Sequence, residues 1–298
     1  MITVSGLTKH YGGRVAVDDL TFEVAAGRVT GFVGPNGAGK STTMRMMVGL
    51  TRPDRGEVRC NGIRYRDLEI PARTVGSVLD ARCMHPGRTA RAHLRATAAL
   101  SRIPASRVET VLAEVGLETV ADQRAGRFSL GMRQRLALAG ALLGDPEILL
   151  LDEPSNGLDP DGIRWLRDHL SGFARRGGTV FVSSHLISEL SMFADDLIVV
   201  GGGKLLAAES LAAITARNDV AVLVETPDAA RLLDLLAERG IAAEVTAGRV
   251  VVRGTSRAAV SQVAFDHGVR VVGLTETARS LEDSLLDLTR SSAEFASS

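Results

Sequence analysis

The chain has 298 residues, of which 45% are hydrophobic and 23% are charged, a composition typical of a globular protein. This length suits one large domain and one small domain. Lysine and arginine together number 35, as do aspartate and glutamate, and this neutral balance disfavours a nucleic-acid partner, which usually needs a basic excess.

Cysteine usage and apolar runs indicate the compartment. Cys60 and Cys83 lack metal-ligand spacing and are too few for a disulfide framework, which favours buried thiols in a reducing cytosol. The amino terminus does not follow the pattern of a signal peptide, and no stretch approaches the roughly 18 apolar residues of a membrane-spanning helix. We therefore expect a cytoplasmic chain whose membrane role would require another polypeptide.

The first 50 residues contain two strands, then a strand, a glycine-rich loop and a helix. Strand-like stretches at residues 2–7 and 20–25 alternate with glycine-containing turns, and an apolar run at residues 28–33 leads into the loop. Residues 40–50 follow a helical pattern, with Gly49 as a stop signal. Strand, loop and helix in this order form the arrangement that a phosphate-binding site requires.

The rest of the chain divides into a helical section, further strands and a small domain. Apolar residues at helical spacing predict a helical subdomain over about residues 89–144, and the continuous apolar runs that follow predict buried parallel strands at residues 148–151 and 179–182. We predict an α/β domain over residues 1–217. The remainder, residues 218–298, follows a βαββαβ pattern, and we predict a small α+β, ferredoxin-like domain with a dimer-stabilising or regulatory role.

The end of the small domain contains two further predicted elements. The apolar run at residues 269–274 predicts its last strand. A capping box beginning at Ser280 predicts a terminal helix after that strand.

The strongest single motif is a phosphate-binding loop at residues 34–41, which fits the pattern G-x-x-x-x-G-K-[ST]. Lys40 would contact the β and γ phosphates of a nucleotide, Ser41 would offer its hydroxyl to Mg²⁺, and Thr42 would add a phosphate contact. The alternative is a glycine-rich turn with a solvated lysine, and the pattern arises by chance in roughly one such chain in a hundred. The predicted nucleotide-binding residues of the loop are Gly34, Pro35, Asn36, Gly37, Ala38, Gly39, Lys40, Ser41 and Thr42.

A pair of carboxylates ends the predicted strand at residues 148–151. Asp152 would hold Mg²⁺, directly or through water, and Glu153 would orient and deprotonate the attacking water. The carboxyl end of a strand is where ligands bind to an α/β sheet. A strand-ending turn is the alternative, which the upstream phosphate loop makes less favourable.

Further motifs follow in a fixed order and carry a resemblance. The phosphate loop is followed by FSLGMRQ at residues 128–134, by Asp152 and Glu153, by NGLD at residues 156–159 and by SH at residues 184–185. Over roughly its first 215 residues the chain resembles the ATP-binding subunits of ABC transporters. The resemblance implies a P-loop NTPase fold with a helical signature subdomain that binds and hydrolyses ATP with Mg²⁺ as a dimer.

The resemblance also implies roles for five other residues. Tyr11 should stack on adenine, and His185 should sense or orient the γ phosphate. Ser129 and Gly131 should bind the γ phosphate held by the opposite subunit, and Asp159 should link the two sites of the dimer. Taken alone, Ser129 could be a structural N-cap, His185 a structural hydrogen-bonding residue and Tyr11 an ordinary core or surface aromatic.

Two positions depart from the family pattern. Met132 replaces the usual glutamine of the signature and removes a polar contact. Asp80 stands where the family usually has a glutamine near Mg²⁺, and it adds a negative charge close to the metal. The alternative for Asp80 is a turn aspartate without nucleotide contact. Residues 81–89 would face the membrane subunit in this family, or form an ordinary solvated loop.

The leading hypothesis is a transport ATPase that acts with a separate transmembrane permease subunit, as a homodimer or with a related ATPase subunit. The signature, the acidic residue at position 80 and the small tail domain resemble drug-type efflux subunits, which implies export and a place on the inner face of the cell membrane. A soluble ABC ATPase acting on ribosomes or DNA would usually need a second cassette or a long coiled coil. A regulator that does not hydrolyse ATP is disfavoured by Glu153 and His185.

Overall fold

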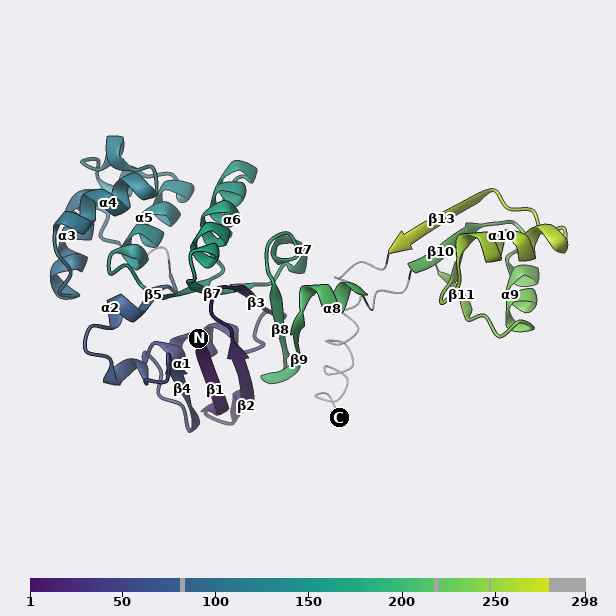
Figure 1. Ribbon diagram of the computed structural model, residues 1–298, viewed down its shortest axis with the longest axis horizontal. Helices are drawn as coiled ribbons and strands as arrows, with labels where there is room; N and C mark the ends of the chain where they lie inside the picture. The colour runs from purple at the N-terminus through teal and green to yellow at the C-terminus, as the bar shows by residue number, and fades with distance from the viewer. Residues whose placement is uncertain (81–83, 217–219, 247, 279–298) are drawn as a thin grey trace. The chain divides into compact units, whose positions relative to one another are not determined.

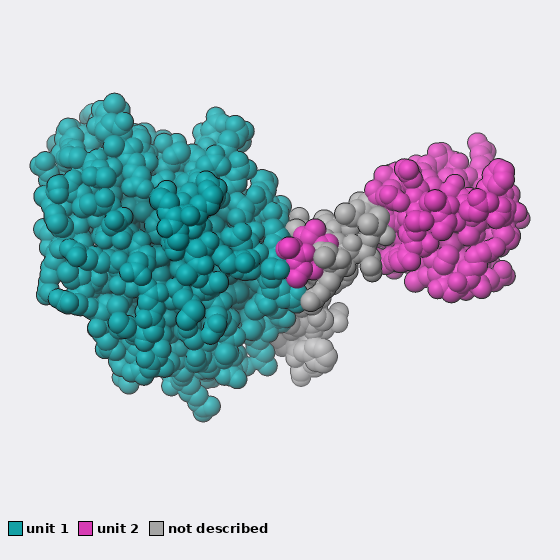
Figure 2. Space-filling model, in the orientation of Figure 1, with its two compact units in different colours: residues 1–211, 288–298 teal, residues 212–287 magenta. Residues whose placement is uncertain are grey.

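We describe a computed structural model of the chain, which covers residues 1–80, 84–216, 220–246 and 248–278. The described residues divide into two compact units, one running from Met1 to Leu211 and one beginning at Ala212 (Figure 2). The predicted domain boundary falls on residues 217–219, and the predicted helix from Ser280 also lies outside the described residues.

An antiparallel three-stranded sheet forms one layer of the first unit (Figure 1). Its order is β2-β1-β4, with β1 at Ile2–Tyr11, β2 at Arg14–Val24 and β4 at Arg55–Cys60. The two strands predicted at the start of the chain are thus confirmed and are longer than the apolar stretches indicated. Backbone pairing extends a strand beyond its apolar residues, because each added residue gains ladder hydrogen bonds.

The second sheet of this unit has six strands in the order β5-β6-β7-β3-β8-β9. The first five run parallel, and β9 pairs antiparallel with β8. The strands are β3 (Val29–Val33), β5 (Val75–Val78), β6 (Ile148–Asp152), β7 (Thr179–Ser184), β8 (Asp196–Gly201) and β9 (Lys204–Ser210). The prediction of buried parallel strands at residues 148–151 and 179–182 is confirmed, since both ranges are fully buried within β6 and β7.

Helix α1 begins at Lys40 and ends at Met47, directly after the glycine-rich loop. It stops before the predicted Leu50 because Gly49 has a φ of 71°, which turns the chain out of the helix. The N–H of Gly49 donates to the carbonyl of Met46 and that of Leu50 to the carbonyl of Arg45, as in a Schellman motif. The stop signal predicted at Gly49 is therefore confirmed.

The predicted helical subdomain is also confirmed. It contains α3 (Ala90–Leu100), α4 (Ser106–Glu114) and α5 (Leu130–Leu142), which gather side by side in Figure 1, and α5 also contacts β5. The other α-helices described in the first unit are α2 (Pro71–Thr74), α6 (Pro160–Arg175) and α7 (Ile187–Leu190), and α8 (Leu211–Ala216) begins at the last residue before the second unit. Among the helices that the structure describes, none combines the length and apolarity needed to cross a bilayer.

Three phenylalanines join the two sheets. The ring centroid of Phe32 on β3 lies 5.0 Å from that of Phe181 on β7, and the centroid of Phe22 on β2 lies 5.9 Å from each. All three side chains are buried, so this aromatic contact removes a large apolar area from water between the layers. The sheet edge that carries the phosphate loop is thus held on a rigid core.

The second unit has the order of elements predicted from its sequence: β10 (Val220–Glu225), α9 (Ala229–Ala237), β11 (Ala243–Thr246), β12 (Arg249–Val252), α10 (Arg257–Asp266) and β13 (Gly273–Ala278). Its sheet order is β11-β12-β10-β13, and every neighbouring pair is antiparallel. This is the expected ferredoxin-like topology. Val222, Leu232 and Val260 contribute to a core that belongs to this unit alone.

The last strand of the second unit begins later than predicted. The sequence indicated residues 269–274, but β13 starts only at Gly273. The backbone N–H of Arg270 donates to a carboxylate oxygen of Asp228, and its carbonyl accepts from the hydroxyl of Thr226. Side chains of the loop after β10 therefore occupy the backbone groups that a strand would need for its ladder.

Candidate active site

The glycine-rich loop lies between β3 and α1, and its glycines are required by close packing. An added Cβ at Gly34 would lie 2.2 Å from the carbonyl oxygen of Val200, and one at Gly39 would lie 2.4 Å from that of Ala16. Gly37 and Gly39 also have φ values of 83° and 98°, which side chains rarely adopt. The loop can therefore bring its backbone N–H groups close to a bound anion at the positive end of α1.

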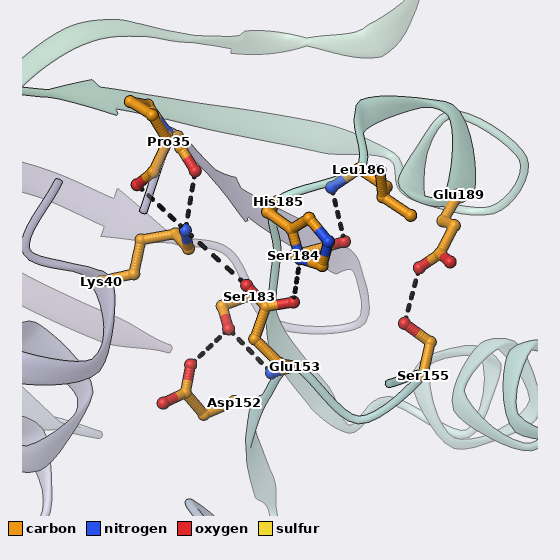
Figure 3. Close-up of polar contacts among 11 residues, drawn as sticks. Pro35, Lys40, Asp152, Glu153, Ser155, Ser183, Ser184, His185, Leu186 and Glu189 are labelled. Atoms are coloured by element: carbon orange, nitrogen blue, oxygen red, sulfur yellow. Dashed lines mark hydrogen bonds and ion pairs between the residues drawn. The ribbon is translucent and has the colours of Figure 1, made fainter. Parts of the chain in front are cut away.

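Lys40 opens α1 with a buried ammonium group. Its side chain is only 6% exposed, and Nζ donates to the carbonyl oxygens of Gly34 (2.7 Å) and Pro35 (3.4 Å). The same nitrogen lies 3.6 Å from Oε1 of Glu153 (Figure 3). A buried cation needs such partners, and their oxygens place it where the phosphate groups of a nucleotide would lie against the loop.

Asp152 and Glu153 stand at the carboxyl end of β6, as predicted, and three neighbouring side chains hold them (Figure 3). Ser183 on β7 donates its hydroxyl to Oδ1 of Asp152 at 2.6 Å. Nδ1 of His185 lies 2.7 Å from Oε2 of Glu153, whose other oxygen faces Lys40. One carboxylate thus connects the lysine of the phosphate loop to the histidine that follows β7.

The backbone of Glu153 is in the left-handed region, with a φ of 50°. This conformation costs about 1–3 kcal/mol for a residue with a side chain, and such strain persists only where surrounding contacts hold it. Its N–H donates to the hydroxyl of Ser183 at 2.9 Å, and its carboxylate contacts His185 and Lys40. The side chain is 20% exposed and can therefore reach both its neighbours and solvent.

A cavity of 510 Å³ collects most of the residues predicted for the nucleotide, whereas Gly34, Pro35, Ala38 and Asp152 are not among the residues that line it. Tyr11 forms part of its wall at 51% exposure, with the ammonium of Lys9 5.6 Å from its ring centroid. Thr42 and His185 line the cavity as well. Its lining is formed by Tyr11, Arg14, Ala16, Asn36, Gly37, Gly39, Lys40, Ser41, Thr42, Glu153, Asn156 and His185.

Ser129, Gly131 and Asp159 do not line that cavity; they line a second one, of 330 Å³, together with Met132 and Leu158. Ser129 caps α5, since its hydroxyl accepts from the N–H of Met132 at 3.2 Å. Asp159 caps α6 by accepting from the N–H of Gly162 at 2.8 Å. Within one chain, the structure therefore does not bring the signature residues together with Lys40.

Asp80 follows β5 and is exposed, and it is not among the described residues that line either cavity. Its assignment to the metal remains a prediction. Of the loop predicted to face a membrane subunit, residues 81–83 lie outside the described residues, and Cys83 with them. Residues 84–89 lead into α3, which Thr89 caps by accepting from the N–H of Ala92.

Three residues of the site were not predicted from the sequence. Arg14 and Asn156 line the first cavity, and Ser183 bonds the Asp152 carboxylate and the backbone N–H of Glu153. Asn156 belongs to the NGLD motif, but the motif predicts a role only for Asp159. Arg14 and Ser183 had no sequence signal of their own, because their approach depends on how β2 and β7 pair with other strands.

A family model described as ABC transporter matches residues 17–156, which include the phosphate loop and both carboxylates. YhcH of Bacillus subtilis, an uncharacterized ABC transporter ATP-binding protein, is 32% identical over 297 residues, covering 99% of this chain and 97% of the relative. The chain belongs to the ABC transporter ATP-binding proteins. A second family model, a domain of unknown function, matches residues 220–282.

Other ABC proteins support the same assignment. The bacitracin transport ATP-binding protein BcrA of Bacillus licheniformis is 40% identical over 209 residues, 69% of this chain and 68% of that protein. A solved ATP-binding subunit of an ABC transporter superposes with a TM-score of 0.66 at 28% identity, covering 73% of this chain and 92% of the other. A dimeric ABC cassette solved with ADP and phosphate gives a TM-score of 0.64 at 26% identity, with 71% and 99% covered. As a member of this family, the chain is an ATPase.

Proposed function

We propose that this ABC protein is the ATP-hydrolysing subunit of an exporter, and that it drives a separate transmembrane permease from the inner face of the cell membrane. Relatives support the direction: similar chains are named as bacitracin transport, lantibiotic transport and Nod factor export ATP-binding proteins. The cargo would be a drug-like or other small molecule, and its path would lie in the permease. The neutral charge balance gives no reason to expect a nucleic-acid partner.

The observation that carries the proposal is the division of the site between two cavities. Lys40, Glu153 and His185 border one cavity, whereas Ser129 and Gly131 border the other. Both sets would contact one nucleotide if two subunits faced each other head to tail, each presenting its signature helix to the phosphate loop of its partner. The partner would be a second copy or a related ATPase subunit.

The residues of the first cavity fit a nucleoside triphosphate with Mg²⁺. Gly34 and Gly39 let the loop pack against the carbonyl oxygens of Val200 and Ala16, where a side chain would clash, and the buried ammonium of Lys40 supplies a positive charge. The hydroxyl of Ser41 and the carboxylate of Asp152 are hard oxygen donors of the kind Mg²⁺ prefers, and Asp80 is a third candidate. Bound Mg²⁺ would neutralise charge that develops on the phosphate oxygens.

Glu153 would act as the general base toward water, and His185 would orient the same region. Oε2 of Glu153 lies 2.7 Å from Nδ1 of the imidazole, so the carboxylate is already oriented before it would accept a proton from the attacking water. Ser129 would point the amino end of α5 at the phosphate of the opposite subunit. Tyr11 would stack on adenine, and Asp159 would connect the two sites through the dimer.

The experiment is Mg²⁺-ATP hydrolysis by the purified chain and by Glu153→Gln, with size-exclusion chromatography in ATP. We expect the parent to hydrolyse ATP and the variant to hydrolyse it at least about 10²-fold more slowly. The variant should also remain a dimer with ATP bound. Glu147→Gln is the matched control, because Glu147 precedes the other end of β6 and bonds Asn61. If the parent binds ATP without hydrolysing it, the result would instead favour the alternative function of a regulator that does not hydrolyse ATP.

Export is tested in cells that express the chain together with a candidate transmembrane permease. Bacitracin-like peptides and small drugs should accumulate less in these cells than in cells carrying Glu153→Gln. Equal accumulation of every compound tested, in cells whose parent ATPase is active, would contradict export while leaving the ATPase assignment intact.

A further inference from the structure

Ser183 connects the carboxylate of Asp152 to the backbone of Glu153. Its hydroxyl donates to Oδ1 of Asp152 at 2.6 Å and accepts the backbone N–H of Glu153 at 2.9 Å (Figure 3). A serine hydroxyl has one hydrogen to donate, and here that hydrogen goes to Asp152. Both bonds therefore have a defined direction.

The position of Ser183 follows from the pairing of β6 with β7. Asp152 is the register partner of Ser183, and this is the last pair of the parallel ladder. Beyond it the chain turns at Glu153, whose φ of 50° takes its N–H out of the strand. No ladder carbonyl is paired with that N–H in the described residues, and the Ser183 hydroxyl serves as its acceptor.

Ser183 is fully buried, so water does not compete for either bond. A buried N–H without an acceptor is unfavourable, and so is a carboxylate that loses a donor at the same depth. Removal of the hydroxyl would therefore disturb Asp152 and Glu153 together. The neighbouring Ser184 does not substitute for it, because its hydroxyl accepts from the N–H of Leu186.

We propose that Ser183 is a positioning residue for hydrolysis. Its hydroxyl fixes the Asp152 carboxylate through Oδ1, which leaves Oδ2 for the cation. The same hydroxyl stabilises the left-handed turn that directs the Glu153 carboxylate toward His185 and Lys40. The inference rests on the proposed roles of Asp152 toward Mg²⁺ and of Glu153 toward water, and it adds a residue on which both depend.

The decisive variants change the hydroxyl with little change in volume. Ser183→Ala and Ser183→Cys remove or weaken the hydrogen bonds, and Ser183→Thr keeps a hydroxyl on a strand that tolerates β-branching. For Ser183→Ala and Ser183→Cys we expect kcat to fall about 10- to 100-fold and the Mg²⁺ concentration for half-maximal rate to rise about tenfold. Ser183→Thr should recover most of both, and the Kd for ATP in EDTA should not change in any variant.

Two readouts do not depend on turnover. With a non-hydrolysable ATP analogue, Mn²⁺ binding measured by electron paramagnetic resonance should weaken about tenfold in Ser183→Ala. Hydrogen exchange of a peptide that covers residues 150–156 should become faster, because the Glu153 amide loses its acceptor. Both values should return toward those of the parent in Ser183→Thr.

Thr30→Val is the matched control. Thr30 is buried on β3, the neighbour of β7, and its Oγ1 has no hydrogen-bond partner among the described residues. Loss of this hydroxyl should leave kcat, the Mg²⁺ dependence and the exchange of residues 150–156 unchanged. If the Ser183→Ala variant folds and has the same Mg²⁺ dependence and kcat as the parent, the positioning role is overturned and the proposed function still stands. A parent chain without hydrolysis would instead refute the proposed function.

Discussion

Nζ of Lys40 lies 3.6 Å from Oε1 of Glu153, so the cation of the phosphate loop and the candidate general base face each other in one cavity. The pair joins the start of α1 to the end of β6, two elements separated by more than a hundred residues of sequence. The contact explains how a buried lysine and a partly buried carboxylate are both tolerated at this edge of the sheet.

Lys40→Ala removes the cation and leaves the Glu153 carboxylate without this neighbour. We expect ATP binding to weaken at least tenfold and hydrolysis to fall by about 10²- to 10³-fold, because the phosphate charge loses its buried partner. Equilibrium binding of a fluorescent ATP analogue and a steady-state rate check this. Lys204→Ala, which removes an exposed lysine paired with Asp18, should change neither value. Normal hydrolysis in Lys40→Ala would contradict the site.

Gly39→Ala tests the geometry of the phosphate loop. The added Cβ would lie 2.4 Å from the Ala16 carbonyl oxygen, at a φ of 98°, so the loop must move. We expect a loss of about 1–3 kcal/mol in the free energy of unfolding and a loss of ATP binding. Gly140→Ala on α5 is the control. Apart from its chain neighbours and the backbone of its own helix, no atom lies within 4 Å of the added Cβ, so we expect the free energy of unfolding to rise by up to about 1 kcal/mol. Urea unfolding measures both; equal effects would contradict the packing argument.

Asp159 has a structural role and a proposed dimer role, and two variants separate them. Asp159→Ala removes the cap of α6 and should lower the free energy of unfolding by about 1 kcal/mol. Asp159→Asn keeps a capping oxygen, so its stability should stay close to that of the parent. If Asp159 also links the two ATP sites, both variants should reduce ATP-dependent dimerisation. Parental dimerisation in Asp159→Asn would restrict the residue to capping.

The pH dependence of stability contains a contribution from His169. Burial lowers the pKa of His169 below its ordinary value of 6.5, because the imidazolium is disfavoured away from water. The unfolded chain therefore binds a proton at a higher pH than the folded chain. The contribution of neutral His169 to the free energy of unfolding is complete above pH 6.5, and it is lost as the pH falls from there toward the pKa of the folded state.

The variant His169→Phe keeps a ring against Trp165, whose centroid lies 5.4 Å from the imidazole. It should reduce the loss of unfolding free energy between pH 8 and pH 5.5, measured by urea titration at each pH. An unchanged difference between the two pH values would mean that His169 does not contribute.

Local sequence determined a large part of this protein. The loop glycines, the start of α1 at Lys40, its end near Gly49 and the buried strand before Asp152 all follow from patterns a few residues long, since turn geometry, helix capping and burial are local preferences. The order of motifs identified the family. The prediction failed where a tertiary contact replaced a local one, as at Arg270, whose backbone bonds delay β13.

Tertiary structure alone decided the contacts of the site. Ser183 meets Asp152 because β6 and β7 pair in one particular register, and a shift by one residue would turn the hydroxyl to the other face of the sheet. The separation of Ser129 from Lys40 into two cavities likewise depends on how the helical subdomain packs against the sheet. Register and packing are set by many weak contacts between distant residues, so no local pattern encodes them.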